Sequence, residues 1–595
     1  MTEQTLTRFF QSTVAAHGSA VAMRYRENRE WHDITYAELA ARVEAIAAGL
    51  KSLGVGHGDR VAIYAENQPN WVITDLACHA LGAINASIYP TLPPPQVAFI
   101  VNDSTAKVLI AGNAKLLANA RIAQAECPSL SQLVVMGSVA DGDALSFTQL
   151  EERGKTHPFG PGEYEASWKG VQPDDIASLI YTSGTTGDPK GAMLTHKNFT
   201  SNAINGLALF SKGGVTITAD DTFLSFLPLS HSFERIGCYL AIGSGATTAY
   251  SEGVKTLADE MKTVQPTVML CVPRLWEMMQ ERVLAAAEKA GEMRFAIFTK
   301  SLEAAKECIR EEQAGRHPSM ALNIQRATGE KLVFPKIREE FGGKFRLLVS
   351  GGAALNPETA LFWRALGMNL VEGYGLTETS PVISINPGHA ARIGTVGQVI
   401  NEGEVKIAPD GEICYRGPNV MKGYWKNEQA TRDMIDDEGW LHTGDIGTLS
   451  ADGYLKITDR KKDIIVLANG KNVSPVPIET KIKNSPFITE VVLIGDKQNT
   501  ITALVVPNKE KLREAGFTEA DDNALLALPE VKKKIKSEID AHSTALADFE
   551  KIKKFTLINA VFSIDTGELT PTLKVKRKVI LQKWAKEVAE LRGDE

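Results

Sequence analysis

The sequence lacks a long apolar run. No stretch approaches the roughly 20 consecutive apolar residues that a membrane-spanning helix needs. The best candidate, residues 236–250, is interrupted by Gly243, Ser244, Gly245, Thr247 and Thr248. Residues 1–8 do not show the basic and then apolar layout of a secretory signal. These absences argue against a membrane span and a signal segment, and we expect a cytoplasmic protein.

Cysteine is scarce and follows no pattern. The six cysteines are scattered, and no two of them form a CxxC pair. We therefore expect reduced, mostly buried thiols, as in a cytoplasmic protein. The residues are Cys78, Cys127, Cys238, Cys271, Cys308 and Cys414.

The chain has no large excess of one charge. Its 65 lysines and arginines and 72 acidic residues give a net charge of -7. This balance argues against a dedicated nucleic-acid binder, although it leaves room for a local basic patch. The lysine-rich segments 531–536 and 551–554 are interpreted as solvated helix faces. We find no internal repeat and no low-complexity segment.

The composition is that of an ordinary globular protein, with 44% hydrophobic and 23% charged residues. At 595 residues the chain exceeds what one core normally organises, so two or more domains are expected.

Short apolar runs alternate with helical patterns from residue 32 past residue 130. Thr35 is a candidate cap for a helix that Gly54 closes. The alternation predicts an α/β chain with largely parallel sheets. A charged, proline-free stretch at 276–313 is interpreted as a solvated helical insertion. The other expected elements are strands at 60–64, 108–110, 133–135, 176–180, 222–226, 267–272 and 346–350, and a helix at 71–81.

The pattern of the sequence changes beyond Gly394, where short turns become frequent. Turns at 410–411, 438–439 and 452–453 predict hairpin-rich β structure up to residue 459. A charged junction at 459–463 then precedes an apolar run, so we place a domain boundary there. The predicted fold is α/β: a large N-terminal domain (1–459) of mostly parallel sheets with a β-rich subdomain (about 394–459), and a small, mobile α+β C-terminal domain (460–595).

Small and hydroxylated residues follow the expected strand 176–180. Backbone N–H groups at such a strand end are free to bind phosphate oxygens, and glycine allows close approach. Lys190 adds a positive charge, but it stands between Pro189 and Gly191 and so does not fit the Walker pattern. We interpret the segment as a phosphate loop and not as an ordinary surface loop. Its residues are Thr182, Ser183, Gly184, Thr185, Thr186, Gly187 and Lys190.

Further candidate residues follow other expected strands. His231 lies just past a strand end, where α/β ligand sites gather, and the residues alone leave a structural role equally open. The glycine pair at 351–352 permits close approach of a ligand or another backbone. Tyr374 offers an aromatic face, and Glu378 offers the oxygen ligand that Mg²⁺ prefers. Asp445 is a plausible acceptor for ribose hydroxyls, although its loop is also ordinary turn chemistry.

Together, these segments resemble the adenylate-forming (AMP-binding) superfamily over nearly the whole chain. Several are similar to its long-chain fatty acid–CoA ligase (acyl-CoA synthetase) branch, notably LPLSHSFER, GYGLTETSP and LTPTLK. The resemblance implies a two-step ligase that uses Mg²⁺, ATP and coenzyme A. A carboxylate attacks the α-phosphate of ATP, and the thiol of coenzyme A then displaces AMP. The matching segments are 181–191, 227–235, 350–355, 373–381, 439–447, 459–475 and 569–577.

The resemblance also implies residue roles. The phosphate loop holds the β- and γ-phosphates, Thr185 and Glu378 ligate Mg²⁺, and Tyr374 stacks on adenine. Asp445 and Arg460 hold the ribose. The nucleotide-binding set further includes Gly352, Ala353, Gly375 and Thr377.

Lys574 matches the family's terminal lysine, which reaches the carboxylate and the α-phosphate. Leu573 stands where the commoner family ending has glycine, and Lys576 is a less favoured alternative.

The resemblance also implies that the small domain swings between the two half-reactions. A face around Gly470 and Lys471 then lines the path of the thiol. Lys462 is the candidate hinge, with Asp459 as a contender, and His231 borders the acyl tunnel.

Three functions stay open at this point. The first is a long-chain fatty acid–CoA ligase. The second is a relative acting on an aryl or medium-chain acid, or a fatty-acyl-AMP ligase that loads a carrier protein. The third, a catalytically silent acyl- or nucleotide-binding protein, is disfavoured by the intact set of charged residues. The expected partners are a fatty acid, ATP and coenzyme A, without nucleic acid. Peripheral contact with the inner face of a membrane is open, as is the choice between monomer and homodimer.

Overall fold

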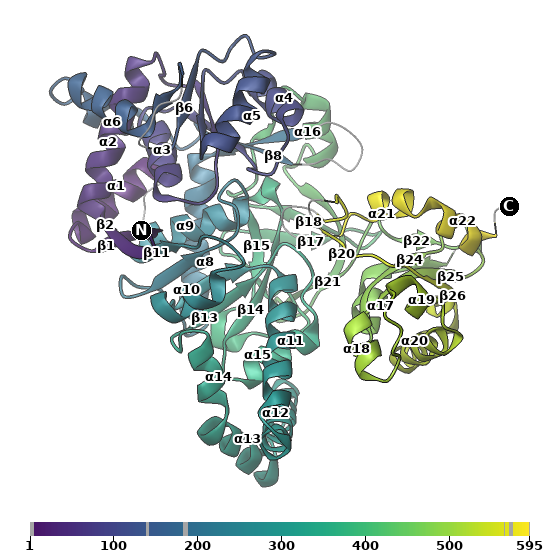
Figure 1. The fold of residues 1–595 in the computed structure, drawn as a ribbon. Coiled ribbons are helices and arrows are strands. Elements are labelled where there is room, and N and C mark those ends of the chain that lie inside the picture. Colours follow the sequence, from purple (N-terminus) through teal and green to yellow (C-terminus); the bar gives the residue numbers. More distant parts are fainter. Residues whose placement is uncertain are drawn as a thin grey trace.

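A computed structural model describes residues 5–137, 142–182, 189–469, 471–563, 566–569 and 575–593. Figure 1 shows helices packed around two large sheets, with a smaller group of elements, α17 to α22, at the C-terminal end of the chain. No helix among the described residues is both long enough and apolar enough to span a bilayer. All six cysteines are free and buried, which confirms the expected thiols.

An eight-stranded sheet has the order β19-β9-β8-β4-β3-β5-β6-β7. The strands from β8 to β7 run parallel, whereas β9 lies antiparallel to both β8 and β19. All four strands predicted in this region are confirmed. The bounds are β3 Arg60–Tyr64, β4 Ile84–Ile88, β5 Val108–Ala111, β6 Gln132–Val135, β7 Leu145–Ser146, β8 Ile176–Thr182, β9 Lys190–Thr195 and β19 Gly423–Tyr424.

A nine-stranded sheet has the order β16-β15-β14-β13-β12-β10-β11-β1-β2. Its strands from β14 to β1 run parallel, so their carboxyl ends share one edge. The three strands predicted here, at 222–226, 267–272 and 346–350, are confirmed. The bounds are β1 Val21–Glu27, β2 Glu30–Thr35, β10 Thr222–Ser225, β11 Thr247–Tyr250, β12 Val268–Cys271, β13 Leu347–Ser350, β14 Leu370–Gly375, β15 Val382–Ile385 and β16 Gln398–Val399.

Helices pack on these sheets, and their termini follow local sequence signals. Thr35 and Glu38 form a capping box at the start of α2, and Gly54, with a φ of 81°, follows its end. The helix predicted after Thr35 is thus confirmed, as is the helix at 71–81. The bounds are α1 Leu6–His17, α2 Tyr36–Ser52, α3 Pro69–Ala80, α4 Pro94–Ser104, α5 Ala114–Gln124, α6 Phe147–Thr156, α7 Glu163–Gly170, α8 His196–Lys212, α9 Ser232–Ser244 and α10 Leu257–Val264.

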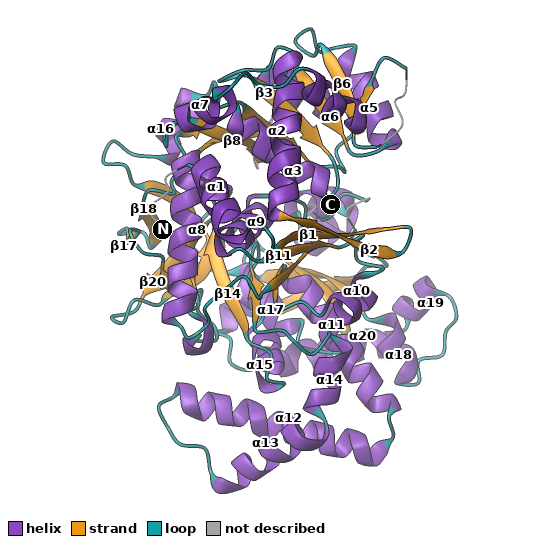
Figure 2. Cartoon of the chain, turned by 90° about the vertical axis from the view of Figure 1, so that its left-hand side faces the viewer, coloured by secondary structure: helices purple, strands orange, loops and turns teal. Residues whose placement is uncertain are grey.

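The stretch predicted as a helical insertion forms two helices, because the chain turns at Gly291, where φ is 99°. The second, α12, lies beside α13 at the lower end of the molecule (Figure 2). It is less solvated than predicted, since Phe298, Leu302 and Ala305 are buried. The helices of this region are α11 Pro273–Lys289, α12 Glu292–Gln313, α13 Met320–Leu332, α14 Phe334–Glu340 and α15 Pro357–Ala365.

The β-rich region beyond Gly394 is confirmed as a four-stranded antiparallel sheet, in the order β17-β18-β20-β21. Two other strands of the region beyond Gly394 lie outside this sheet. β16 joins the nine-stranded sheet, and β19 joins the eight-stranded sheet. The region is therefore tied to both large sheets. The bounds are β17 Glu404–Ile407, β18 Glu412–Arg416, α16 Glu428–Met434, β20 Leu441–Leu449 and β21 Leu455–Arg460.

A separate hydrophobic core begins at Ile465 and surrounds the sheet β24-β25-β26. The domain boundary at 459/460 stays a prediction, as does the mobility of the C-terminal domain. Residues 531–536 form the expected helix face, but the prediction for 551–554 is wrong, because β26 begins at Ile552. The bounds are β22 Ile465–Val466, β23 Asn472–Val473, α17 Pro475–Ile482, β24 Ile488–Ile494, β25 Ile501–Pro507, α18 Lys509–Glu514, α19 Asp522–Ala527, α20 Pro529–His542, β26 Ile552–Leu557, α21 Arg577–Lys583 and α22 Ala585–Arg592.

A buried ion pair joins α9 to α3 and to the eight-stranded sheet. The Arg235 guanidinium donates to Asp75 Oδ1 at 2.6 Å and to Ser87 Oγ of β4 at 2.8 Å. Tyr239 O–H donates to Asp75 Oδ2 at 2.7 Å, and Trp71 packs against the guanidinium. Burial alone would raise the pKa of Asp75. Arg235 and His79 of α3 outweigh this effect and hold that pKa well below its usual range.

We expect Asp75→Ala to lower the free energy of unfolding by about 3–5 kcal/mol, because it leaves the Arg235 charge buried without a partner. Asp33→Ala is the matched control. It removes the exposed pair with Arg24 and should cost no more than about 1 kcal/mol. Urea unfolding followed by tryptophan fluorescence measures both; equal losses in the two variants would contradict the role of the buried pair.

Candidate active site

The predicted nucleotide contacts gather where β13 and β14 end. Gly352 and Ala353 follow β13, and Tyr374 and Gly375 are the last residues of β14. A short 3₁₀ turn, Thr377–Thr379, comes next and carries Glu378. Parallel strands thus bring these residues to one edge of the nine-stranded sheet, as the sequence predicts.

Tyr374, Asp445 and Arg460 form one hydrogen-bonded chain. Tyr374 O–H donates to Asp445 Oδ2 at 2.7 Å, and Arg460 Nε donates to Asp445 Oδ1 at 3.0 Å. Asp445 and Arg460 face each other across β20 and β21. Burial disfavours the Arg460 charge, but the nearby Asp445 carboxylate outweighs it and raises the Arg460 pKa. Asp445 is therefore held as a buried acceptor, with its two oxygens fixed in direction.

Glu378 has a partner that sequence analysis missed. Tyr424 O–H donates to Glu378 Oε1 at 2.6 Å, and Lys190 Nζ lies 5.3 Å from the centre of the Tyr424 ring. The Glu378 side chain is buried, and the hydrogen bond from Tyr424 fixes the direction of its carboxylate. The Glu378 carboxylate is therefore a candidate ligand for a hard cation.

The pairing of β19 with β9 explains how Tyr424 reaches this place. Tyr424 lies opposite Ala192 in the sheet, two residues beyond Lys190. Trp425 N–H also donates to Gly191 O at 2.8 Å. No local sequence pattern marks Tyr424, because its position depends on a strand pairing across more than 200 residues.

Part of the predicted phosphate loop can be placed. Thr182 ends β8, and its Oγ1 donates to Lys190 O at 3.5 Å, so both ends of the loop lie side by side. Several predicted residues lie outside the described part of the chain, and their roles stay predictions. They are Ser183, Gly184, Thr185, Thr186, Gly187, Gly470 and Lys574.

His231 has a structural role at the start of α9. Its Nδ1 accepts a hydrogen bond from Phe233 N–H at 3.1 Å, and its ring meets Tyr89 edge-on. The next residue, Ser232, has its Oγ 3.4 Å from Thr377 Oγ1. The helix start therefore packs near the 3₁₀ turn of the site. The predicted contact of His231 with an acyl tunnel stays a prediction.

Three further predicted residues, Lys462, Lys471 and Lys576, belong to the predicted C-terminal domain. Lys471 Nζ lies 4.4 Å from the centre of the Phe549 ring. Lys576 precedes α21, and its N–H donates to Glu568 O at 2.7 Å. Lys462 follows β21 and is exposed. The roles of Lys471, Lys576 and Lys462 stay predictions.

Two buried carboxyl groups near the strand ends also escaped sequence analysis. Glu234 lies in the first turn of α9, and its buried carboxyl oxygen Oε2 has no hydrogen-bond partner among the described residues. Glu372 of β14 accepts a hydrogen bond from Leu355 N–H at 2.9 Å. Burial raises the pKa of each to about 8.

Two family models match the chain. The model described as AMP-binding enzyme covers residues 10–425, and that described as AMP-binding enzyme C-terminal domain covers residues 462–594. The chain is similar to the long-chain-fatty-acid–CoA ligase FadD15 of Mycobacterium tuberculosis, at 35% identity over 98% of each chain. It is also similar to the peroxisomal long chain acyl-CoA synthetase 7 of Arabidopsis thaliana, at 34% identity over 94% of this chain and 82% of that protein.

The fold of the chain is similar to the folds of solved structures. The anthranilate CoA ligase AuaEII in complex with anthranoyl-AMP has a TM-score of 0.73 and 21% identity over 98% of each chain. At this identity the match supports the fold alone. Together with the relatives, it confirms the predicted resemblance and the α/β fold class with a large N-terminal and a smaller C-terminal part.

The raised pKa of Glu234 predicts a pH dependence of stability. Between pH 4.5 and about 8 the folded protein keeps a proton on Glu234 that the unfolded chain has lost. Stability therefore falls as pH rises through this window, by up to about 1.4 kcal/mol per pH unit. Glu372, whose pKa is raised to a similar value, contributes to the same window, so we expect Glu234→Gln to reduce the slope in urea unfolding between pH 5 and 8 to the part that Glu372 supplies. Glu303→Gln, on an exposed helix face, is the control and should leave the slope unchanged.

Proposed function

Since the chain belongs to the family of AMP-binding enzymes, we propose that it is an ATP-dependent acid–thiol ligase for long-chain fatty acids. It joins the acid to AMP, releases pyrophosphate, and transfers the acyl group to coenzyme A with release of AMP. Relatives of nearly the same length that carry the names of such ligases support this proposal. The observation that carries it is the chain Tyr374–Asp445–Arg460 beside the buried carboxylate Glu378.

The proposed nucleotide site uses this chain directly. Tyr374 stacks its ring on adenine, and its hydrogen bond to Asp445 fixes the ring against rotation. Asp445 keeps lone pairs for ribose hydroxyls, because each oxygen accepts one of the hydrogen bonds that hold it. Arg460 pairs with Asp445 Oδ1 at 3.0 Å and holds the carboxylate in place. Gly352, Ala353, Gly375 and Thr377 line the same edge of the sheet and complete the proposed contacts.

Glu378 suits a hard divalent cation. Tyr424 occupies Oε1, which leaves Oε2 for Mg²⁺. We assign Thr185 as a second ligand and Lys190, with the rest of the phosphate loop, to the phosphate oxygens. When bound, Mg²⁺ neutralises negative charge on those oxygens.

The remaining roles follow the order of the reaction. In the first step an oxygen of the fatty acid carboxylate attacks the α-phosphorus, the bond to pyrophosphate breaks, and Lys574 stabilises the charge on both reacting groups. In the second step the thiol sulfur attacks the acyl carbon and AMP leaves. Lys462 serves as the hinge between the steps, Gly470 and Lys471 line the thiol's path, and His231 borders the acyl chain.

The deciding experiment measures AMP release with acids from acetate to oleate, with and without coenzyme A. We expect AMP release that depends on coenzyme A and is fastest with long-chain acids. A preference for aryl or medium-chain acids would show that the substrate is not a long-chain fatty acid. Pyrophosphate exchange without thioester formation would favour a fatty-acyl-AMP ligase, and no exchange with any acid would favour a silent binding protein.

The magnesium assignment predicts a graded loss in two variants. We expect Glu378→Ala to lower kcat/KM for ATP by about 100-fold or more at limiting Mg²⁺, because a ligand is lost. Tyr424→Phe keeps the carboxylate and loses only its hydrogen bond, so the expected loss is about 10-fold. Initial rates over a Mg²⁺ series measure both. Unchanged activity of Glu378→Ala at limiting Mg²⁺ would refute this role.

A further inference from the structure

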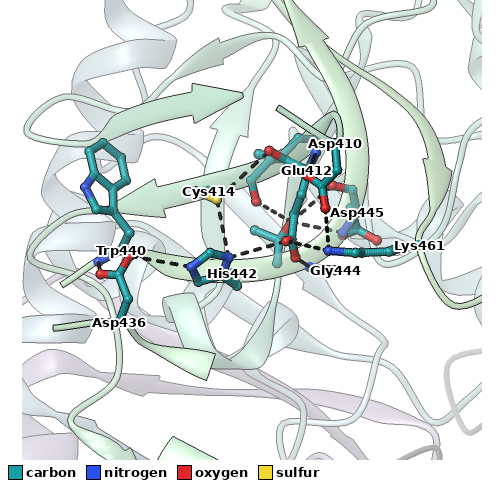
Figure 3. Close-up of polar contacts among 11 residues, drawn as sticks. Asp410, Glu412, Cys414, Asp436, Trp440, His442, Gly444, Asp445 and Lys461 are labelled. Atoms are coloured by element: carbon teal, nitrogen blue, oxygen red, sulfur yellow. Dashed lines mark hydrogen bonds and ion pairs between the residues drawn. The ribbon is translucent and has the colours of Figure 1, made fainter. Parts of the chain in front are cut away.

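Glu412, Cys414 and His442 bring three different ligand atoms together in the β-rich sheet (Figure 3). A carboxylate oxygen, the thiol sulfur and an imidazole nitrogen all lie within 4.8 Å of one another. Cys414 of β18 and His442 of β20 are direct partners across the strand pair. Among the described residues, no other group of histidine, cysteine and acidic side chains is arranged to hold a metal ion.

The three atoms converge on one side of the imidazole. His442 Nδ1 lies 3.6 Å from Cys414 Sγ and 3.3 Å from Glu412 Oε2. A ring nitrogen offers one lone pair or one proton, so it cannot bond well to both partners at once. A cation in the middle can bind all three atoms.

The other side of the imidazole carries a second, independent signal. His442 Nε2 lies 3.5 Å from Asp436 Oδ2. Asp436 is itself held in place, because its Oδ1 accepts hydrogen bonds from the N–H groups of Glu438 and Trp440 at 3.0 and 2.8 Å. A carboxylate that binds the far nitrogen of a histidine is the usual outer partner of a metal-bound imidazole.

The burial of the cluster leaves one side accessible. Cys414 and Glu412 are buried, whereas the His442 side chain is 37% exposed. Three protein ligands with an open side match a zinc site that takes water as its fourth ligand. Mixed sulfur, nitrogen and oxygen ligands suit Zn²⁺, whereas Mg²⁺ prefers oxygen alone.

One cation already contacts this carboxylate. Lys461 Nζ lies 3.1 Å from Glu412 Oε2, but it also binds Asp410 Oδ2 at 2.6 Å. Lys461 is half exposed and keeps the Asp410 partner when it leaves Glu412. Zinc therefore replaces one of two contacts without stranding a buried charge.

We propose that Glu412, Cys414 and His442 form a binding site for Zn²⁺, with Asp436 orienting the imidazole. On binding, the Cys414 thiol releases its proton to solvent and binds as thiolate, and His442 binds as neutral imidazole through Nδ1. The site is separate from the proposed magnesium ligand Glu378.

The test uses the full-length, untagged protein and Co²⁺ as a coloured substitute for Zn²⁺. We expect one Co²⁺ per chain, with the intense near-ultraviolet absorption of a thiolate–cobalt bond, and loss of that absorption when Zn²⁺ is added. Cys414→Ser should abolish the absorption, and Asp436→Asn should weaken Zn²⁺ binding by about 10- to 100-fold. Cys308→Ser, a buried cysteine of α12, is the matched control and should bind like the wild type.

Two results would overturn the proposal. One is Co²⁺ binding without thiolate absorption in the wild type. The other is an unchanged Zn²⁺ affinity in His442→Gln, a variant at a partly exposed position that serves where Cys414→Ser fails to fold. Circular dichroism checks folding in each variant, and isothermal titration with Zn²⁺ gives the affinities.

Discussion

The ion pair of Arg235 with Asp75 is the constraint on which the placement of the site depends. Two charges taken out of water are tolerable only when each is fully hydrogen-bonded. Here Ser87, Tyr239 and Asn85 supply further hydrogen bonds, and His79 Nε2 lies 3.1 Å from Asp75 Oδ1. The pair fixes α9 against α3 and β4, and therefore fixes the start of α9, where Ser232 meets Thr377. A polar network in the interior thus sets the position of residues at the edge of a different sheet.

The second constraint is that the β-rich region supplies an edge strand to each of the two large sheets. The region beyond Gly394 contributes β16 to the nine-stranded sheet and β19 to the eight-stranded sheet. Each added strand covers a sheet edge that would otherwise expose unpaired backbone groups. The same pairing brings Tyr424 between Lys190 and Glu378. The β-rich region therefore helps to build the site and is more than an attachment to it.

Much of the fold could be predicted because its signals are local. The capping box of Thr35, the short apolar strands and the turns beyond Gly394 each depend on neighbouring residues. The errors have non-local causes. Phe298 is buried in a helix whose sequence is rich in charge, and Ile552 begins a strand because β25 is there to pair with it.

The candidate site likewise contains residues that the sequence identifies and residues that it does not. Tyr374, Asp445 and Arg460 stand in recognisable segments, so the resemblance pointed to all of them. Tyr424 could not be found, since only the pairing of β19 with β9 gives it a role. The hydrogen bond between Tyr374 and Asp445 joins residues 71 positions apart and likewise has no local signal.

Two consecutive residues at the end of β21, Arg460 and Lys461, contact two different groups of acidic side chains. Arg460 is the last residue of β21, and Lys461 begins the turn that follows it. Arg460 pairs with Asp445 in the proposed nucleotide site, whereas Lys461 pairs with Asp410 and with the proposed zinc ligand Glu412. The backbone links the two groups, because Lys461 N–H donates to Gly444 O and Gly444 N–H donates to Glu412 Oε1, both at 2.8 Å. Gly444, the residue that precedes Asp445, is therefore hydrogen-bonded to both Glu412 and Lys461, and the end of β21 joins the proposed zinc site to the proposed nucleotide site.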